Sequence, residues 1–147
     1  MIKLENIKLG YGSRTLLEGV STTFEAGTLT ALLGRNGTGK STLLRAIAAL
    51  GNLDGGSIEL SGDNIYTLDS EQIARRISFV TTDKIRIANL SCEDVVALGR
   101  APYTNWIGRL QEVDREIVAD ALAAVGLSEF ARKSMDAMSD GECQRVM

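Results

Sequence analysis

In its first third the chain reads Gly34-Arg35-Asn36-Gly37-Thr38-Gly39-Lys40-Ser41, which fits the pattern G-x-x-x-x-G-K-[ST]. An almost wholly apolar run, residues 29–33, comes directly before it, and apolar residues at helical spacing follow from Ser41. These neighbours predict a buried strand at 29–33, then a loop, then a helix that ends near Gly51. A strand, a glycine-rich loop and a helix are the context in which this pattern binds phosphate.

The residue types in this loop suit the binding of a nucleoside triphosphate and Mg²⁺. Glycines allow successive N–H groups to turn inward around an anion, and the helix adds its positive dipole end. Lys40 supplies a mobile charge to the outer phosphates, the Ser41 hydroxyl is a hard oxygen ligand for Mg²⁺, and Thr42 can donate to another phosphate. The alternative, a glycine turn that precedes a lysine by chance, would occur in roughly half a percent of such chains. The expected nucleotide-binding residues of the loop are Gly34, Asn36, Gly37, Thr38, Gly39, Lys40, Ser41 and Thr42.

On either side of the loop the sequence alternates between short strands and helices. Apolar residues alternate with polar ones from Ile2 through Leu4, and glycines separate the short strands that follow, which indicates an antiparallel start. Beyond the loop, Asp69 with Gln72 three residues later predicts a capped helix. The predicted elements are strands at 15–17, 21–24, 57–60 and 77–80 and a helix at 69–76.

The chain changes character after about residue 90, where helical patterns replace the alternation of strands and helices. The residues Ser91-Cys92-Glu93-Asp94 form a capping box that opens a helix, and Gly126 ends a later helical stripe. We expect a boundary between subdomains here, within a single domain of 147 residues. The stripe consists of Val113, Ile117, Val118, Ala121, Leu122 and Val125.

Composition and charge narrow the class of protein further. The residues are 44% hydrophobic and 24% charged, as in soluble globular domains, and the formal net charge of -3 gives no basic surface for nucleic acid. No stretch has the apolar length of a secretory signal or a membrane span, so we expect no direct membrane insertion. Cys92 and Cys143 lie far apart in a chain without histidine, which excludes a Cys/His metal site and suits a reducing compartment.

Two further stretches carry a resemblance to a known family. Tyr11 lies in Gly10-Tyr11-Gly12-Ser13-Arg14, a polar, glycine-flanked turn that favours a platform for a planar base over the alternative, a strand or core position. Near the end of the chain, Met138-Ser139-Asp140-Gly141-Glu142 reads as the start of a helix. Together with the phosphate loop and the helical insert, these residues resemble the ATP-binding subunits of ABC transporters over the whole chain.

The resemblance implies an α/β fold, a P-loop NTPase of ABC type. Residues 1–90 would form an antiparallel β subdomain and the start of a RecA-like core, residues 91–138 a helical subdomain, and residues 139–147 the signature and the start of the next helix. Tyr11 would stack on the adenine of ATP. In the family the signature meets the ATP held by a second subunit, which implies a homodimer or an equivalent pair of subunits. The residues at the place of the signature Leu-Ser-Gly-Gly-Gln are Ser139, Asp140, Gly141 and Glu142.

Several positions differ from the family pattern. Asp140 puts a carboxylate where glycine is usual, Glu142 replaces glutamine, and Cys143 stands at a position that is often basic. Thr82 stands where the family has a glutamine that ligates Mg²⁺. Because a threonine side chain is shorter, a bridging water or Asp83 could substitute for direct ligation.

The stretch Val96-Ala97-Leu98-Gly99-Arg100-Ala101-Pro102-Tyr103 resembles the Leu-Gly-Arg-x-Pro-Tyr segment of importers for iron-siderophore complexes, haem and cobalamin. The resemblance implies that the region from Thr82 to Trp106 contacts a transmembrane permease. Tyr103 and Trp106 would be interface residues there; ordinary core positions are the alternative. Such a subunit would be cytoplasmic and peripheral, held at the inner face of the cell membrane by the permease.

The family also has catalytic residues that this sequence does not contain. In the family, a strand ending in aspartate and a catalytic glutamate follows the signature helix, and a switch histidine comes later; this chain ends at Met147 and has no histidine. We therefore expect a C-terminally incomplete domain with no complete catalytic set. Its apolar strand edge should be open or covered by oligomerisation. The parent protein would be an ATPase that drives import. One alternative is a nucleotide-binding module without turnover. The other is a small phosphotransferase, but that alternative does not explain residues 139–142.

Overall fold

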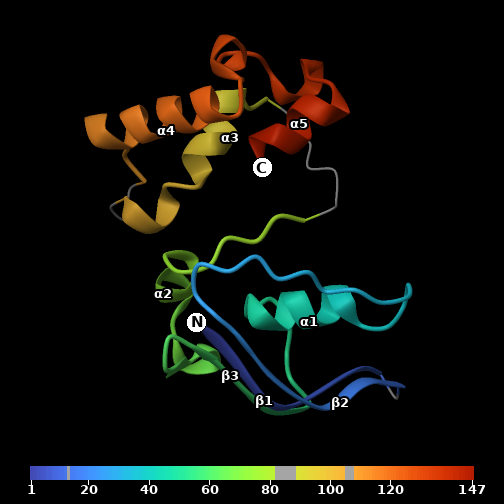
Figure 1. Cartoon of the computed structure of the whole chain (residues 1–147). Helices are drawn as coiled ribbons and strands as arrows, with labels where there is room; N and C mark the ends of the chain where they lie inside the picture. Colours follow the sequence, from blue (N-terminus) through green and yellow to red (C-terminus); the bar gives the residue numbers. More distant parts are fainter. Residues whose placement is uncertain (13, 82–88, 105–107) are drawn as a thin grey trace. The chain divides into compact units, whose positions relative to one another are not determined.

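The computed structural model describes residues 1–12, 14–81, 89–104 and 108–147 and divides into two compact units. The first unit is Met1–Ser78 and the second is Phe79–Met147 (Figure 1). Each unit has its own hydrophobic core. The change in sequence pattern near residue 90 lies within the second unit. In neither unit do the described residues include a helix with the length and apolar character of a membrane span.

An antiparallel sheet with helix α1 on one face forms most of the first unit. The elements are β1 (Ile2–Tyr11), β2 (Arg14–Phe24), α1 (Lys40–Ile47), β3 (Gly55–Leu60), β4 (Asp63–Asn64), the 3₁₀ turn η1 (Ile65–Thr67) and α2 (Ser70–Ala74). The sheet order is β2-β1-β3-β4, and every neighbouring pair is antiparallel. Leu43, Ala46 and Ile47 of α1 share a core with Leu9 and Ile58 of the sheet. The predicted antiparallel start is confirmed.

The two short strands predicted at 15–17 and 21–24 are one bulged strand, β2. Its pairing with β1 shifts register between Ile7 and Leu9, and Gly19 nearby on β2 has a φ of 71°. Glycine adopts this conformation readily, so it allows an extra residue to bulge out of a continuous strand. The glycine signal therefore marks a bend within one strand and not a turn between two.

The strands predicted at 29–33 and 77–80 are wrong. Residues 28–35 and 77–80 have no regular secondary structure, and Leu29 and Leu33 are 102% and 87% exposed. A buried parallel strand needs a neighbouring strand on each side. In the described residues the only sheet is the antiparallel one, and neither segment belongs to it. The apolar run before the phosphate loop is therefore an exposed segment.

Helix α1 ends earlier than Gly51, the position that the sequence indicated. Its last residue is Ile47, and Ala49, with a φ of 55°, takes the left-handed conformation expected of a glycine after the helix. The Tyr66 hydroxyl is shared between the carbonyl oxygens of Ala46 and Gly51, at 3.2 and 2.9 Å. Tyr66, from another element, thus supplies a hydrogen bond to a carbonyl group at the helix end. No local sequence pattern predicts this contact.

Helices and short 3₁₀ turns form the described part of the second unit. They are α3 (Cys92–Leu98), η2 (Ala101–Tyr103), α4 (Glu112–Ala124), η3 (Ser128–Phe130), η4 (Met135–Ala137) and α5 (Asp140–Val146). Val118 and Leu122 of the predicted stripe are buried in α4, and Gly126, with a φ of 69°, follows the helix as expected. The buried face of α4 begins with Asp114, which was not predicted. The stripe residues that are exposed are Val113, Ile117, Ala121 and Val125.

Each α-helix of the described second unit has an acidic side chain that accepts a hydrogen bond from the backbone N–H of the residue before the helix. Hydrogen bonds to a carboxylate favour its ionised form, so the pKa of each acid lies below its ordinary value. The largest cause for Asp94 is the hydrogen bond from the Ser91 hydroxyl, followed by that from the Ser91 N–H, whereas for Asp114 and Glu142 it is the backbone hydrogen bond. The capping boxes predicted at residues 69–72 and 91–94 are confirmed. The three pairs are Asp94 with Ser91 (2.9 Å), Asp114 with Gln111 (3.0 Å) and Glu142 with Ser139 (2.7 Å).

We expect acid to unfold the second unit. Because the folded-state pKa of these carboxyls lies below the ordinary value, they add stability at neutral pH that is lost as the pH falls from about 5 to below 4. Far-ultraviolet circular dichroism during an acid titration measures the loss of helix. In the control Glu142→Gln, the amide oxygen still accepts from Ser139, as that of Gln72 does from Asp69 before α2, but it carries no charge to lose. The acid transition of this variant should be shallower, and an unchanged transition would contradict the prediction.

Candidate nucleotide-binding site

The glycine-rich loop turns directly into α1. Gly37 and Gly39 have φ values of 80° and 93°, in the left-handed region that residues with a side chain seldom adopt. Gly39 is the N-cap of α1, and because glycine has no side chain, no capping hydrogen bond is made to the first N–H groups of the helix. These N–H groups and the positive end of the helix dipole are therefore available to an anion in the loop.

Lys40 and Thr38 hold the loop together through its carbonyl groups. The Lys40 ammonium donates to the carbonyl oxygens of Gly34 and Arg35, both at 2.8 Å. The Thr38 hydroxyl donates to the carbonyl oxygen of Arg35 at 2.9 Å. A Cβ on Gly34 would lie only 3.1 Å from Thr38 Oγ1, so the loop has little room for a side chain at this position. The charge of Lys40 lies across the loop, beside the first turn of α1, where a phosphate would meet it.

The remaining loop residues offer one candidate ligand for Mg²⁺. Asn36 and Ser41 are exposed, and Thr42 is half-buried in the first turn of α1. The described residues contain no group of three or more acidic or cysteine side chains that could hold a metal ion by themselves. Phosphate oxygens and water would therefore complete the coordination beside the Ser41 hydroxyl. Thr82 and Asp83, the other expected metal contacts, lie outside the described residues.

Tyr11 is the last residue of β1, not part of the turn that the sequence indicated, and it is 86% exposed. The pairing of β1 with β2 shifts register between Leu9 and Gly10, and the extra residue lies on β2, between Leu17 and Thr15. Side chains therefore still alternate along β1, so Tyr11 projects from the same face of the sheet as Leu9, which is buried in the core shared with α1. On the neighbouring strand, Leu16 Cβ lies 3.2 Å from the position that a Cβ on Gly39 would occupy. The exposed ring thus lies on the face of the sheet that carries α1 and the end of the phosphate loop.

Ser139 is the N-cap of α5, in the second unit. Its hydroxyl oxygen accepts from Glu142 N at 3.3 Å, and the Glu142 carboxylate accepts from Ser139 N and pairs with Lys133 at 3.4 Å. The helix start predicted at 138–142 is confirmed, and Glu142 serves it as a capping residue. Asp140 and Gly141 are exposed in its first turn.

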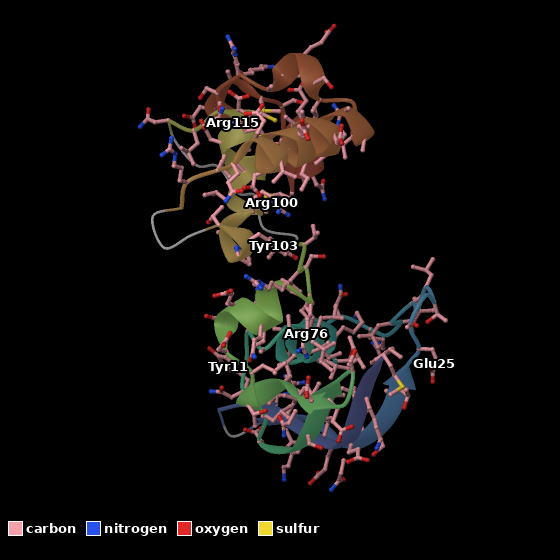
Figure 2. All side chains as sticks on the ribbon, turned by 90° about the vertical axis from the view of Figure 1, so that its left-hand side faces the viewer. Tyr11, Glu25, Arg76, Arg100, Tyr103 and Arg115 are labelled. Atoms are coloured by element: carbon pink, nitrogen blue, oxygen red, sulfur yellow. The ribbon has the colours of Figure 1, made fainter. Side chains whose placement is uncertain are left out.

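Arg100, from the Leu-Gly-Arg-x-Pro-Tyr segment, contacts two residues of the second unit. Its Nε donates to Asp114 Oδ1 at 2.9 Å. Its guanidinium carbon lies 4.2 Å from the centre of the Tyr103 ring (Figure 2). Asp114 is 3% exposed, whereas about half of Tyr103 is exposed. Sequence reasoning missed Asp114; the signal that could have found it is an acid three residues after Gln111 at a helix start. Trp106, the other expected interface residue, lies outside the described residues.

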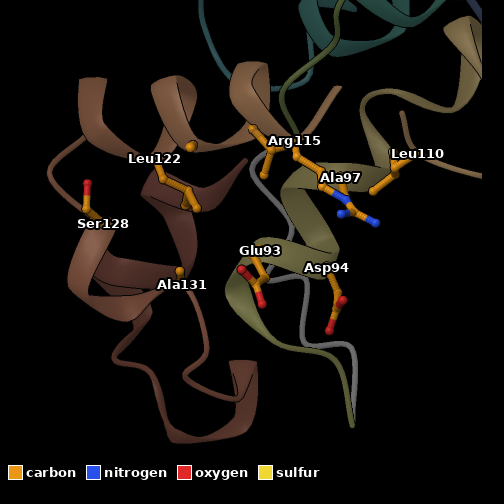
Figure 3. Close-up of a pocket in the computed structure, with 10 residues that line it drawn as sticks. Glu93, Asp94, Ala97, Leu110, Arg115, Leu122, Ser128 and Ala131 are labelled. Atoms are coloured by element: carbon orange, nitrogen blue, oxygen red, sulfur yellow. The ribbon is translucent and has the colours of Figure 1, made fainter. Parts of the chain in front are cut away.

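A cavity of about 450 Å³ lies within the second unit, among α3, α4 and the residues that follow α4 (Figure 3). Its apolar lining includes Ala97 of α3 and Leu122 of α4, and charged groups come from Glu93, Asp94 and Arg115. This combination can receive apolar side chains together with a charged group. The residues that line it are Glu93, Asp94, Ala97, Leu110, Arg115, Val118, Ala119, Leu122, Ser128 and Ala131.

A glycine-rich loop with a lysine across it, followed by a helix without a side-chain cap, defines the class of phosphate-loop proteins. Comparison with known families narrows this class, because residues 17–147 match the family described as ABC transporter. The chain belongs to the ABC transporter family.

Individual relatives agree with this membership. An uncharacterized ABC transporter ATP-binding protein of Methanocaldococcus jannaschii is 37% identical over 147 residues, which is 100% of this chain and 51% of that protein. A probable siderophore transport system ATP-binding protein of Bacillus subtilis is 35% identical over 145 residues, 99% of this chain and 53% of that protein. The solved dimeric structure of a bacterial ABC transporter cassette aligns with a TM-score of 0.84 and 27% identity, over 99% of this chain and 66% of that one. The chain spans about half the length of the curated relatives it matches.

Proposed function

We propose that this chain binds ATP in the loop of residues 34–41. The observation that carries the proposal is the Lys40 ammonium, held across the loop at the start of a helix that no side chain caps. The N–H groups of the loop and of α1 bind the β-phosphate, Lys40 binds the outer phosphates, and Tyr11 stacks on the adenine. When bound, Mg²⁺ neutralises part of the phosphate charge, and the Ser41 hydroxyl is its ligand from this chain.

For the whole protein, we propose an ATPase subunit of an importer that takes up an iron chelate, haem or cobalamin through a membrane permease. Two observations support this: the segment around Arg100 resembles that importer subgroup, and one relative is named for siderophore transport. The subunit is then cytoplasmic and attached to the membrane through the permease. ATP binding is assigned to this chain, and hydrolysis to the whole protein.

We further propose that two such subunits pair around ATP, with residues 139–142 of one subunit against the nucleotide of the other. The Ser139 hydroxyl oxygen already accepts from Glu142 N, so its O–H group is oriented to donate outward, where a phosphate oxygen could accept. The carboxylate of Asp140 points away from the phosphate in such a complex, because like charges repel. A similar solved cassette is dimeric.

The permease is proposed to contact the region from Thr82 to Trp106 and the adjoining cavity. The cavity combines an apolar lining with Glu93 and Arg115, which fits a partner helix that carries both apolar and charged side chains. Tyr103 is exposed enough to take part in such an interface.

Replacing Lys40 tests the assignment of the loop. Lys40→Ala should weaken the binding of a fluorescent ATP analogue by about 100-fold, because it removes charge-assisted hydrogen bonds to phosphate that contribute about 3 kcal/mol. Equilibrium titration of the 147-residue chain measures the affinity. The control Lys8→Ala removes the same charge from β1, where Lys8 pairs with Glu18 at 3.1 Å, and should bind like the unaltered chain. Equal affinity of Lys40→Ala and the unaltered chain would contradict the proposal, and a phosphate-release assay on the same samples distinguishes binding from turnover.

A further inference from the structure

The hairpin of β1 and β2 places an arginine beside the exposed Tyr11. Tyr11 and Arg14 are opposite each other in the pairing of the two strands. Residues directly opposite in an antiparallel pair project from the same face of the sheet, with Cβ atoms roughly 5 Å apart. Arg14 is exposed. Its guanidinium therefore shares with the Tyr11 ring the face of the sheet that carries α1.

Two leucines of β2 lie close to the start of α1. Leu16 Cβ lies 3.2 Å, and Leu17 Cγ 3.6 Å, from the position that a Cβ on Gly39 would occupy. The path along β2 from Leu17 to Arg14 therefore runs from the start of α1 to the Tyr11 ring. A nucleotide with its β-phosphate in the loop and its base on Tyr11 would have its α-phosphate between these two places.

We propose that Arg14 is a further nucleotide-binding residue, whose guanidinium donates to the α-phosphate of the bound nucleotide. The proposal rests on the proposed binding of ATP in the loop. Guanidinium is always charged, and its planar arrangement of N–H groups matches two phosphate oxygens at once. Lys40 serves the outer phosphates, so the two residues distribute positive charge along the triphosphate. Arg14 lies outside the loop pattern, and only the register of the two strands brings it next to Tyr11.

Substitution of Arg14 separates this contact from those of the loop. Arg14→Gln should bind ATP about 10-fold more weakly, the effect of one lost charge-assisted contact. It should bind pyrophosphate like the unaltered chain, because pyrophosphate fills the β and γ positions in the loop and has no α-phosphate for Arg14 to contact. Both are measured by competition with the fluorescent ATP analogue. Arg14→Lys keeps a charge and should retain most of the ATP affinity, and the deficit of Arg14→Gln should shrink as salt concentration rises.

The control Arg75→Gln removes an equal charge from the residue directly after α2, where Arg75 pairs with Glu71 at 2.6 Å, and should bind ATP like the unaltered chain. Unchanged ATP affinity of Arg14→Gln would overturn the proposal. An equal loss for pyrophosphate would also overturn it, because the effect would then lie in the loop. In both cases the dependence of binding on Lys40 would remain. Failure of the ATP site itself is a different result, in which Lys40→Ala and the unaltered chain bind alike.

Discussion

Replacing Gly56 by alanine should destabilise the first unit by about 4 kcal/mol. Gly56 lies in β3 opposite a bulge of β1 and has a φ of 85°. A Cβ at this position would lie 2.4 Å from the carbonyl oxygens of both Glu5 and Asn6. These are backbone atoms of a paired strand and cannot rotate aside, so the clash must separate β1 from β3 in addition to the cost of the left-handed conformation.

Urea unfolding combined with amide hydrogen exchange of β1 and β3 measures this effect. Gly62→Ala is the matched control, because Gly62 has a φ of 95° but no atom within 4 Å of an added Cβ. It carries the conformational cost without the clash, and we expect a loss of about 1 kcal/mol. Equal effects of the two substitutions would show that the close approach of β1 to β3 does not limit the residue at position 56.

Replacing Leu127 by alanine should destabilise the second unit by about 3 kcal/mol, because it leaves a cavity in the core. Leu127 is 0% exposed and belongs to the cluster that joins α3, α4 and α5. Its backbone N–H donates to the carbonyl oxygen of Leu122 at 2.8 Å, which keeps the residue in place after the side chain is shortened. The surrounding helices can therefore close the cavity only in part.

Thermal unfolding followed by circular dichroism tests this expectation. Leu98→Ala is the control, since the same atoms are removed from a leucine of α3 that is more than half exposed. Its stability should change by less than about 1 kcal/mol. A loss at position 98 as large as that at position 127 would contradict the assigned core.

Helix starts could be predicted because their hydrogen bonds are local. Ser91 with Asp94 and Ser139 with Glu142 are pairs three residues apart, and each makes its bonds wherever the helix packs. The glycine conformations of the phosphate loop are local in the same sense, so the loop and the helix after it were found from the pattern alone. The end of α1 was not predicted correctly, because Ala49 adopts the left-handed conformation expected of Gly51. In addition, the Tyr66 hydroxyl, from another element, donates to a carbonyl oxygen at the helix end.

The errors concern features that depend on distant residues. A run such as 29–33 has the composition of a buried strand, but a strand exists only where a neighbour supplies hydrogen bonds. The apolar stripe on α4 shows the same limit, since the pattern did not tell Val118, which is buried, from Val113, which is exposed. Asp114 is buried at the start of the same helix because Arg100, fourteen residues away, pairs with it.

The phosphate loop, its lysine and the capped helix starts follow from the sequence alone, because glycine conformations and bonds between near neighbours are enough to produce them. The exposure of residues 29–33, the pairing of Arg100 with Asp114, and the face that Tyr11 and Arg14 share with the loop depend on the tertiary structure. Strand register and helix packing bring together residues that are distant in the sequence, and no local sequence pattern predicts that these residues are in contact.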